Sequence, residues 1–322
     1  LMLVLLRFVQ GLAIGGQWGG AMLLVTENAP VEKRGWYGAY AQAGAPVGVI
    51  LANLAFLGVS AGLTEEEFMD WGWRLPFIAS FVLIIISMYV QLKLEDTPAF
   101  KALAESKAEN PDEASGLEKS PVAEVIRRYP KRIVLAAGAF LSIQVTFYIL
   151  IAFIVAYGVN SPTVELSRDV MLTAVLIAAA IMVPTQFYFS GLSDRIGRKR
   201  VYQWGAILTG FWGFALFPLI DTGNPYAIVL AVSLGLVFLG MQYGPQAAFF
   251  TELFSTEVRY SGASLGYQLG AIVGGALAPT IAVLLWNNFG IFYVSLYIAL
   301  AAALTLLSLS ALTETQGKDL TE

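Results

Sequence analysis

Nine long apolar segments constrain the fold of this chain more than any other feature of its sequence. Each is at least 20 residues long, about the length that an α-helix needs to cross a bilayer. Most lack the alternating polarity of membrane β-strands. Charged residues make up 13% of the chain, against about 25% in soluble domains. The sequence therefore predicts an all-α integral membrane protein with spans at 1–26, 37–63, 71–92, 133–157, 171–192, 201–220, 226–250, 262–286 and 291–312.

One block of sequence occurs twice, 225 positions apart. Unrelated windows of this length would share roughly one or two residues, so we interpret the block as an internal repeat. Each copy ends one apolar segment, crosses a short charged turn and begins a Gly/Ala-rich segment. Such similar bundles in one chain are typical of secondary transporters. Trp18 corresponds to Tyr243, and the identical pairs are Gly15 and Gly240, Gln17 and Gln242, Gly19 and Gly244, Thr26 and Thr251, Glu27 and Glu252, Glu32 and Glu257, and Arg34 and Arg259.

The repeat also indicates how the chain is divided. Its first copy ends the first apolar segment, whereas its second copy ends the fourth segment of the later half. If the halves are equal, this chain carries nine of twelve helices and begins in the fourth. We expect an incomplete N-terminal bundle of three helices over 1–93, a charged, proline-containing linker over 94–131 and a six-helix C-terminal bundle over 132–322.

The placement of Lys and Arg predicts the orientation. When alternate loops are assigned to one side, that side receives 16 Lys and Arg residues and the other side receives only Arg74 and Arg168. Because positively charged loops stay in the cytoplasm, we expect the linker and the C-terminus to be cytoplasmic, in a multi-pass protein of the cell membrane.

Several kinds of chemistry are excluded by residues that the chain lacks. It contains no Cys and no His, which removes disulfides, thiol nucleophiles and His-based zinc sites. A phosphate-binding loop of the Gly-x-x-x-x-Gly-Lys-Ser/Thr type does not occur, which argues against an ATP-driven pump. We therefore expect no enzyme activity, no cofactor and no metal. We also expect no nucleic-acid partner and a monomer in the bilayer.

Arg7 lies inside an apolar run, where a charge costs about 2.5–3.5 kcal/mol on insertion scales. It should face a polar cavity or a carboxylate, and Gln10 shares its helix face. The alternative is that Arg7 extends its head group to the outer interface.

Several motifs resemble those of a known transporter group. Arg7-x-x-Gln10-Gly11-x-x-x-Gly15 looks like the fourth-helix motif of the major facilitator superfamily, and the segment 191–200 resembles its loop signature between helices eight and nine. The segments 15–20, 71–77 and 95–100 resemble the metabolite:proton symporter family of that superfamily. The resemblance implies the two-bundle fold and proton-coupled transport of a small polar or anionic metabolite by alternating access.

The chain departs from that family at Gln17, where the family usually has Glu. A Gln forms hydrogen bonds but carries no proton, so an uncoupled facilitator of the same fold is the alternative function. Alternatively, Gln17 serves only helix packing or hydrogen bonding and has no part in proton coupling. Because Glu27 and Glu252 read as gate charges, we expect any coupling carboxylate to lie in helices that precede this chain.

Two groups of residues are therefore our site candidates. Gly191 and Gly197 allow a tight turn between helices, and Asp194 could accept hydrogen bonds from a helix start near Arg34. We predict that Arg195 or Arg198 pairs with Glu27 or Glu32. The full gate set is Glu27, Glu32, Arg34, Gly191, Asp194, Arg195, Gly197, Arg198, Glu252 and Arg259. The cavity set of polar and aromatic residues on apolar helices is Arg7, Gln10, Gln17, Trp18, Gln144, Tyr148, Gln242, Tyr243, Gln246 and Gln268, for each of which helix–helix contact is the alternative role.

Overall fold

The structure is all-helical throughout the part of the chain that it describes. This computed structural model describes residues 2–93, 121–161, 164, 166–255 and 258–318. Eight helical segments in these ranges are long and apolar enough to cross a membrane, and the first apolar segment contains a shorter apolar helix. Because each of the other expected spans coincides with one of these segments, the prediction of an all-α membrane fold is confirmed.

The N-terminal half consists of short, consecutive helices. The predicted span 1–26 is broken at Gly15 and Gly16, so it forms two helices rather than one. The next two spans begin with short 3-10 turns, at Val31–Lys33 and Gly72–Arg74. Thr64 and Glu67 form a capping box at the turn between them. The helices are α1 (Met2–Ile14), α2 (Gln17–Glu27), α3 (Arg34–Gln42), α4 (Gly44–Gly62), α5 (Glu65–Asp70), α6 (Leu75–Ala79) and α7 (Phe81–Lys93).

The C-terminal half is a bundle of long helices with a buried core. Two spans contain π-helical turns, at Ile149–Phe153 and Ala271–Ala276, which interrupt the regular ladder and occur often at functional sites. The helices are α10 (Pro121–Arg128), α11 (Pro130–Tyr148), α12 (Ile154–Asn160), α13 (Arg168–Ile196), α14 (Arg198–Asp221), α15 (Pro225–Glu252), α16 (Arg259–Gly270), α17 (Ala278–Phe289) and α18 (Ile291–Ala311).

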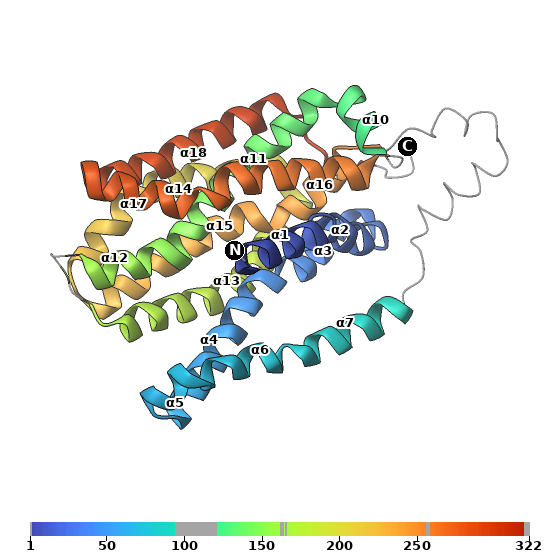
Figure 1. Cartoon of the computed structure of the whole chain (residues 1–322). Helices are drawn as coiled ribbons and strands as arrows, with labels where there is room; N and C mark the ends of the chain where they lie inside the picture. The colour runs from blue at the N-terminus through green and yellow to red at the C-terminus, as the bar shows by residue number, and fades with distance from the viewer. Residues whose placement is uncertain (1, 94–120, 162–163, 165, 256–257, 319–322) are drawn as a thin grey trace, which may run out of the picture.

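The two halves differ in how much of their apolar surface they bury. The hydrophobic core is formed almost entirely by α11–α18, with α15 at its centre. In contrast, α4 leads away from the bundle, and α6 and α7 return at a distance from it (Figure 1). No residue of α7 is buried within the described chain. The contact between the halves is made by α2, α3 and α4 against α13, α15 and α16.

The repeat predicts the helix ends on both sides of the charged turn. In the first copy α2 ends at Glu27 and α3 begins at Arg34, and in the second α15 ends at Glu252 and α16 begins at Arg259. Both pairs of boundaries are offset by the same 225 residues as the sequence. The copies therefore share two helices and the turn between them.

The predicted linker lies mostly outside the described residues, because the structure describes it only from Pro121. From there α10 forms a short amphipathic helix that packs on α11 and α16. This packing attaches the end of the predicted linker to the C-terminal bundle.

Candidate functional site

Four residues, two from each copy of the repeat, form a ring between the halves, which we call the aromatic–amide ring. The indole of Trp18 stacks on the phenol of Tyr267, with centroids 4.2 Å apart. The Trp18 Nε1 atom donates a hydrogen bond to Gln42 Oε1 at 3.1 Å. Gln42 Nε2 in turn donates to the Tyr243 carbonyl at 2.9 Å, and the Tyr243 and Tyr267 side chains lie next to each other at the same cavity. The 225-residue offset relates Trp18 to Tyr243 and Gln42 to Tyr267. Equivalent positions of the two copies therefore lie opposite each other across the aromatic–amide ring.

A cavity of about 110 Å³ adjoins this ring. Ala45 from α4 lines one side, and Gln144 and Tyr148 from α11 line the other together with Tyr243 and Tyr267. None of the described residues that line it carries a formal charge. The cavity therefore offers hydroxyl, amide and aromatic groups to a ligand and lies where the halves meet.

Two ion pairs connect the halves at the end of the bundle where the charged turns lie. Arg34 of the first copy lies 3.4 Å from Glu252 of the second. Arg259 of the second copy lies 3.0 Å from Glu27 of the first. All four side chains are at most 6% exposed. Because each arginine pairs with the acid of the other copy, the pairs act between the halves and not within them, and we call these four residues the gate.

Glu252 also holds parts of its own half in place. Arg198 lies 3.4 Å from it, and the Thr315 hydroxyl donates to it at 2.7 Å. Arg34 additionally donates to the carbonyl of Lys318 at 2.9 Å. Removing two charges from water is costly unless they are paired and hydrogen-bonded, and these contacts satisfy that condition.

Asp194 fixes the start of α3 to the C-terminal half. Its carboxylate accepts the backbone N–H groups of Gly35 and Trp36, both at 2.8 Å, and it pairs with Arg198. An anion at a helix N-terminus is favoured by unpaired N–H groups and the helix dipole. A Cβ at Gly35 would lie 2.8 Å from the Ser190 carbonyl, so only glycine allows this approach. The expectation that Asp194 meets the helix start near Arg34 is confirmed.

The predicted pairing of Arg195 or Arg198 with Glu27 or Glu32 is wrong. Arg198 is the first residue of α14, after Gly197 at φ +109°, and its side chain turns inward to its own half. Glu27 instead pairs with Arg259. Arg195 and Glu32 are exposed. Gly191 lies against the ring of Trp36, at 3.2 Å from a hypothetical Cβ.

The predicted cavity set separates into members at the cavity and members elsewhere. Gln144, Tyr148 and Tyr243 line it, and Trp18 reaches it through the aromatic–amide ring. Gln246 is fully buried and accepts from Gln42 at 3.2 Å. These residues come together although they lie on three different helices, α2, α11 and α15.

The other members need correction or stay predictions. Gln242 is not a cavity residue, because it is fully buried and donates to Thr209 of α14 at 2.8 Å. Gln268 donates to the Gly15 carbonyl at 2.8 Å. Arg7 and Gln10 share a face as expected, with 3.0 Å between Nη1 and Oε1, but both are exposed, as is Gln17. Whether these three face the transport path remains a prediction.

Gln42 and Ala45 were missed by the sequence analysis. Gln42 is fully buried between the halves. A signal for it was available, since extending the repeat alignment beyond Arg34 pairs Gln42 with Tyr267. Ala45 carries no polar group, and only its position next to the cavity identifies it.

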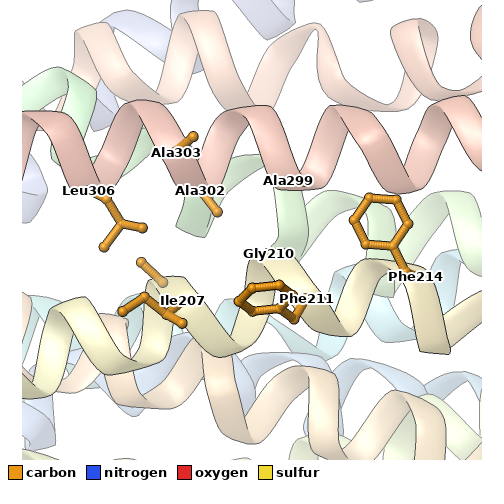
Figure 2. A pocket seen from close by; sticks show the side chains of 9 residues that line it. Ile207, Gly210, Phe211, Phe214, Ala299, Ala302, Ala303 and Leu306 are labelled. Carbon is orange, nitrogen blue, oxygen red and sulfur yellow. The ribbon is translucent and has the colours of Figure 1, made fainter.

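A second hollow lies on the outer face of the C-terminal half, between α14 and α18 (Figure 2). Gly210 allows close approach to Ala302, 3.1 Å from a hypothetical Cβ, while Phe211 and Phe214 form a wall. Phe211 is 74% exposed. All lining residues are apolar, which suits the surface of a span in contact with lipid tails and not a path for a polar solute.

Taken together, these features define a class. A multi-span helical protein with a polar cavity at the meeting of two repeat-related halves, closed at one end by reciprocal ion pairs, is built as a membrane transporter.

The family follows from comparison with known proteins. The profile of the Major Facilitator Superfamily matches residues 1–265. The chain is 40% identical to the inner membrane metabolite transport protein YhjE of Escherichia coli K12, over 99% of this chain and 72% of that protein. It is 33% identical to the E. coli shikimate transporter, over 97% of this chain and 70% of that protein. The chain belongs to the Major Facilitator Superfamily and is a metabolite transporter within it.

Two further comparisons mark the range of the relationship. The E. coli proline/betaine transporter is 30% identical over 99% of this chain and 64% of that protein. The solved structure of the proton:xylose symporter XylE matches with a TM-score of 0.73 at 16% identity, covering 94% of this chain and 69% of that one. The structural match supports the two-bundle fold, of which the described residues carry eight spanning helices and one shorter apolar helix.

Proposed function

We propose that the protein is a secondary active transporter, a proton symporter that moves a small polar or anionic metabolite by alternating access. The observation that carries this proposal is the reciprocal pairing of Arg34 with Glu252 and of Arg259 with Glu27, beside a cavity shared by both halves. Rocking of the halves would separate both pairs together and open the cavity toward that end.

The orientation follows from the excess of Lys and Arg at the gate end. We place this end in the cytoplasm, with the C-terminus, and the protein in the inner membrane as the name of its YhjE relative states. The structure would then represent a state that is closed to the cytoplasm. Names of relatives suggest shikimate, proline and betaine as the first compounds to test.

Alternating access is testable because the chain contains no cysteine. Ala45→Cys puts a single thiol at the cavity. A membrane-impermeant thiol reagent should label it from the periplasmic side in the parent protein, and Arg34→Gln should increase labelling from the cytoplasmic side. Glu32→Gln, a charge removed at an exposed site beside the gate, is the matched control. Equal cytoplasmic labelling in all three proteins would contradict the gate assignment.

An uncoupled facilitator of the same fold is the second candidate, favoured by Gln17 where the resembling family has Glu. Uptake driven by an imposed inward proton gradient separates the two: a symporter accumulates its substrate above equilibrium, whereas a facilitator only equilibrates it. Glu27 and Glu252 are both paired with arginines, so we assign them to the gate and not to proton coupling. Gln17→Glu should change the pH dependence of uptake if position 17 takes part, and identical profiles would remove it from the mechanism.

A further inference from the structure

A basic cavity lies beside the gate, outside the transport path. It measures about 170 Å³ and lies between the start of α11, the end of α15 and the tail that follows α18. Lys131 and Arg132 line it from the first turn of α11, and Lys318 lines it from the tail. Its described lining residues thus include three cations and no carboxylate.

The start of α11 adds to the positive potential of this cavity. No side-chain cap occupies the start of that helix, and the N-terminal end of a helix carries partial positive charge. Lys131 and Arg132 in this turn are repelled by the positive end of the helix dipole and by each other. An anion in the cavity would relieve both repulsions, and the hydroxyl of Thr313 at its edge offers a further donor.

A simpler explanation is that these cations only cap the end of α15. Arg132 does donate to the Leu253 carbonyl at 3.0 Å, and Lys318 to the Glu252 carbonyl at 3.4 Å. Yet an arginine has five N–H donors and a lysine three, so each bond leaves donors for a ligand. Capping of α15 also does not explain why Lys131 lines the same cavity.

We propose that this cavity binds a phosphate-type anion, either the phosphodiester headgroup of an anionic lipid or free inorganic phosphate, and that its binding favours the closed gate. The spans Pro130–Asn160 and Ile291–Ala311 begin and end at the cavity, the level at which headgroups lie. Basic pockets between spanning helices on the cytoplasmic side bind such headgroups. Leu135 and Leu253 supply the apolar part of its wall.

The link to the gate runs through the tail. Glu314 accepts the backbone N–H groups of Arg198 and Lys199, each at 3.0 Å. Thr315 and Lys318 contact Glu252 and Arg34 as described above. An anion that bridges Lys318 to α11 holds this tail against the gate. Its loss would free the tail and weaken the support of Glu252.

Binding can be read without any transport assay, so its failure is distinct from failure of the proposed function. The purified protein is placed in nanodiscs of phosphatidylcholine, with or without phosphatidylglycerol, and its lysines are modified with an amine reagent and quantified by mass spectrometry. Phosphatidylglycerol should reduce modification of Lys131 and Lys318 several-fold relative to Lys93, which lies at the end of α7. Millimolar inorganic phosphate in neutral nanodiscs is the second arm.

The two arms distinguish the source of the anion. Protection by phosphatidylglycerol alone assigns the site to lipid headgroups, and protection by phosphate alone or by both shows that the free anion binds; each outcome supports the site. Lack of protection in both arms, or equal protection of Lys93, would overturn it. Arg132→Gln should weaken protection about fivefold, whereas Arg127→Gln and Arg200→Gln, exposed cations at the same end, should not.

The effect on the gate needs its own readout. Spin labels at Glu32→Cys and Arg195→Cys, both exposed and on opposite halves, report the separation of the halves by pulsed electron resonance. The anion that protects the lysines should increase the short-distance population in the parent protein and not in Arg132→Gln. An unchanged or decreased population in the parent would overturn the coupling to the gate.

Discussion

The two copies of the repeat have the same residues at the gate and yet different surroundings. Glu252 is fully buried and contacts Arg34, Arg198 and Thr315. Glu27 pairs with Arg259 at a side-chain exposure of 6%. The reciprocal pairing is therefore symmetric, and Glu252 additionally pairs with a second arginine, Arg198, of its own half. The comparison teaches that the repeat determines which residues meet between the halves, while the second arginine at Glu252 comes from the start of α14, outside the repeated block.

The largest expected effect is at Glu252. Glu252→Gln leaves Arg34 and Arg198 buried with one fewer carboxylate, and removing one partner of a buried pair costs about 3–5 kcal/mol. Glu27→Gln removes a carboxylate that is paired with Arg259, whereas Glu252 is shared by two arginines, so it should cost less, about 1.5–3 kcal/mol. Denaturant titration in mixed micelles measures the free energy of unfolding. Equal losses in the two variants would mean that the added contacts of Glu252 contribute nothing.

A smaller contrast is expected at two equivalent glycines. A Cβ at Gly244 would lie 2.9 Å from the Gln186 carbonyl and against the Ser190 hydroxyl, which is held by its bond to Gln186 at 2.8 Å. Gly244→Ala should therefore destabilise the protein by about 1–3 kcal/mol.

At Gly19 the main obstacle is the Ser264 hydroxyl, which makes no hydrogen bond within the described chain and is free to rotate. Gly19→Ala should cost less than Gly244→Ala in the same titration. The opposite order would show that the two contacts between helices are not as the structure has them.

The smallest effects are expected at Glu32 and Arg195. Both were gate candidates from the sequence, and both are exposed. Exposed charges contribute about 0–1 kcal/mol, so Glu32→Gln and Arg195→Gln should leave unfolding and uptake within error of the parent. A loss of uptake in either variant would return that residue to the gate.

Much of the fold was predictable because the bilayer restricts the options. The lengths of the apolar segments predicted the spans. The repeat predicted the helix ends at Glu27, Arg34, Glu252 and Arg259. The break between α1 and α2 was not predicted, although α15 continues through the equivalent Gly240. Two adjacent glycines lower helix propensity, and Tyr260 and Gln268 bind the carbonyls of Gly16 and Gly15. Tyr260 and Gln268 lie on α16, and the sequence pattern does not predict that this helix packs against α2.

The choice of side-chain partners was less predictable than the position of the helices. The sequence placed Arg198 correctly at the gate end and gave it the wrong carboxylate. That choice depends on the direction in which α14 leaves Gly197 and on a Glu252 already close to Arg34. Gln42 illustrates the opposite case, because the repeat alone would have identified it.

The most direct test of the central claim is the distance between the halves at the gate. Labels at positions 32 and 195, measured without added anion, should give a larger short-distance and a smaller longer-distance population in the parent protein. Glu27→Gln and Glu252→Gln should each enlarge the longer-distance population, more for Glu252→Gln and most in the double variant, because both pairs hold the halves together. An unchanged distribution in all three variants would contradict the account.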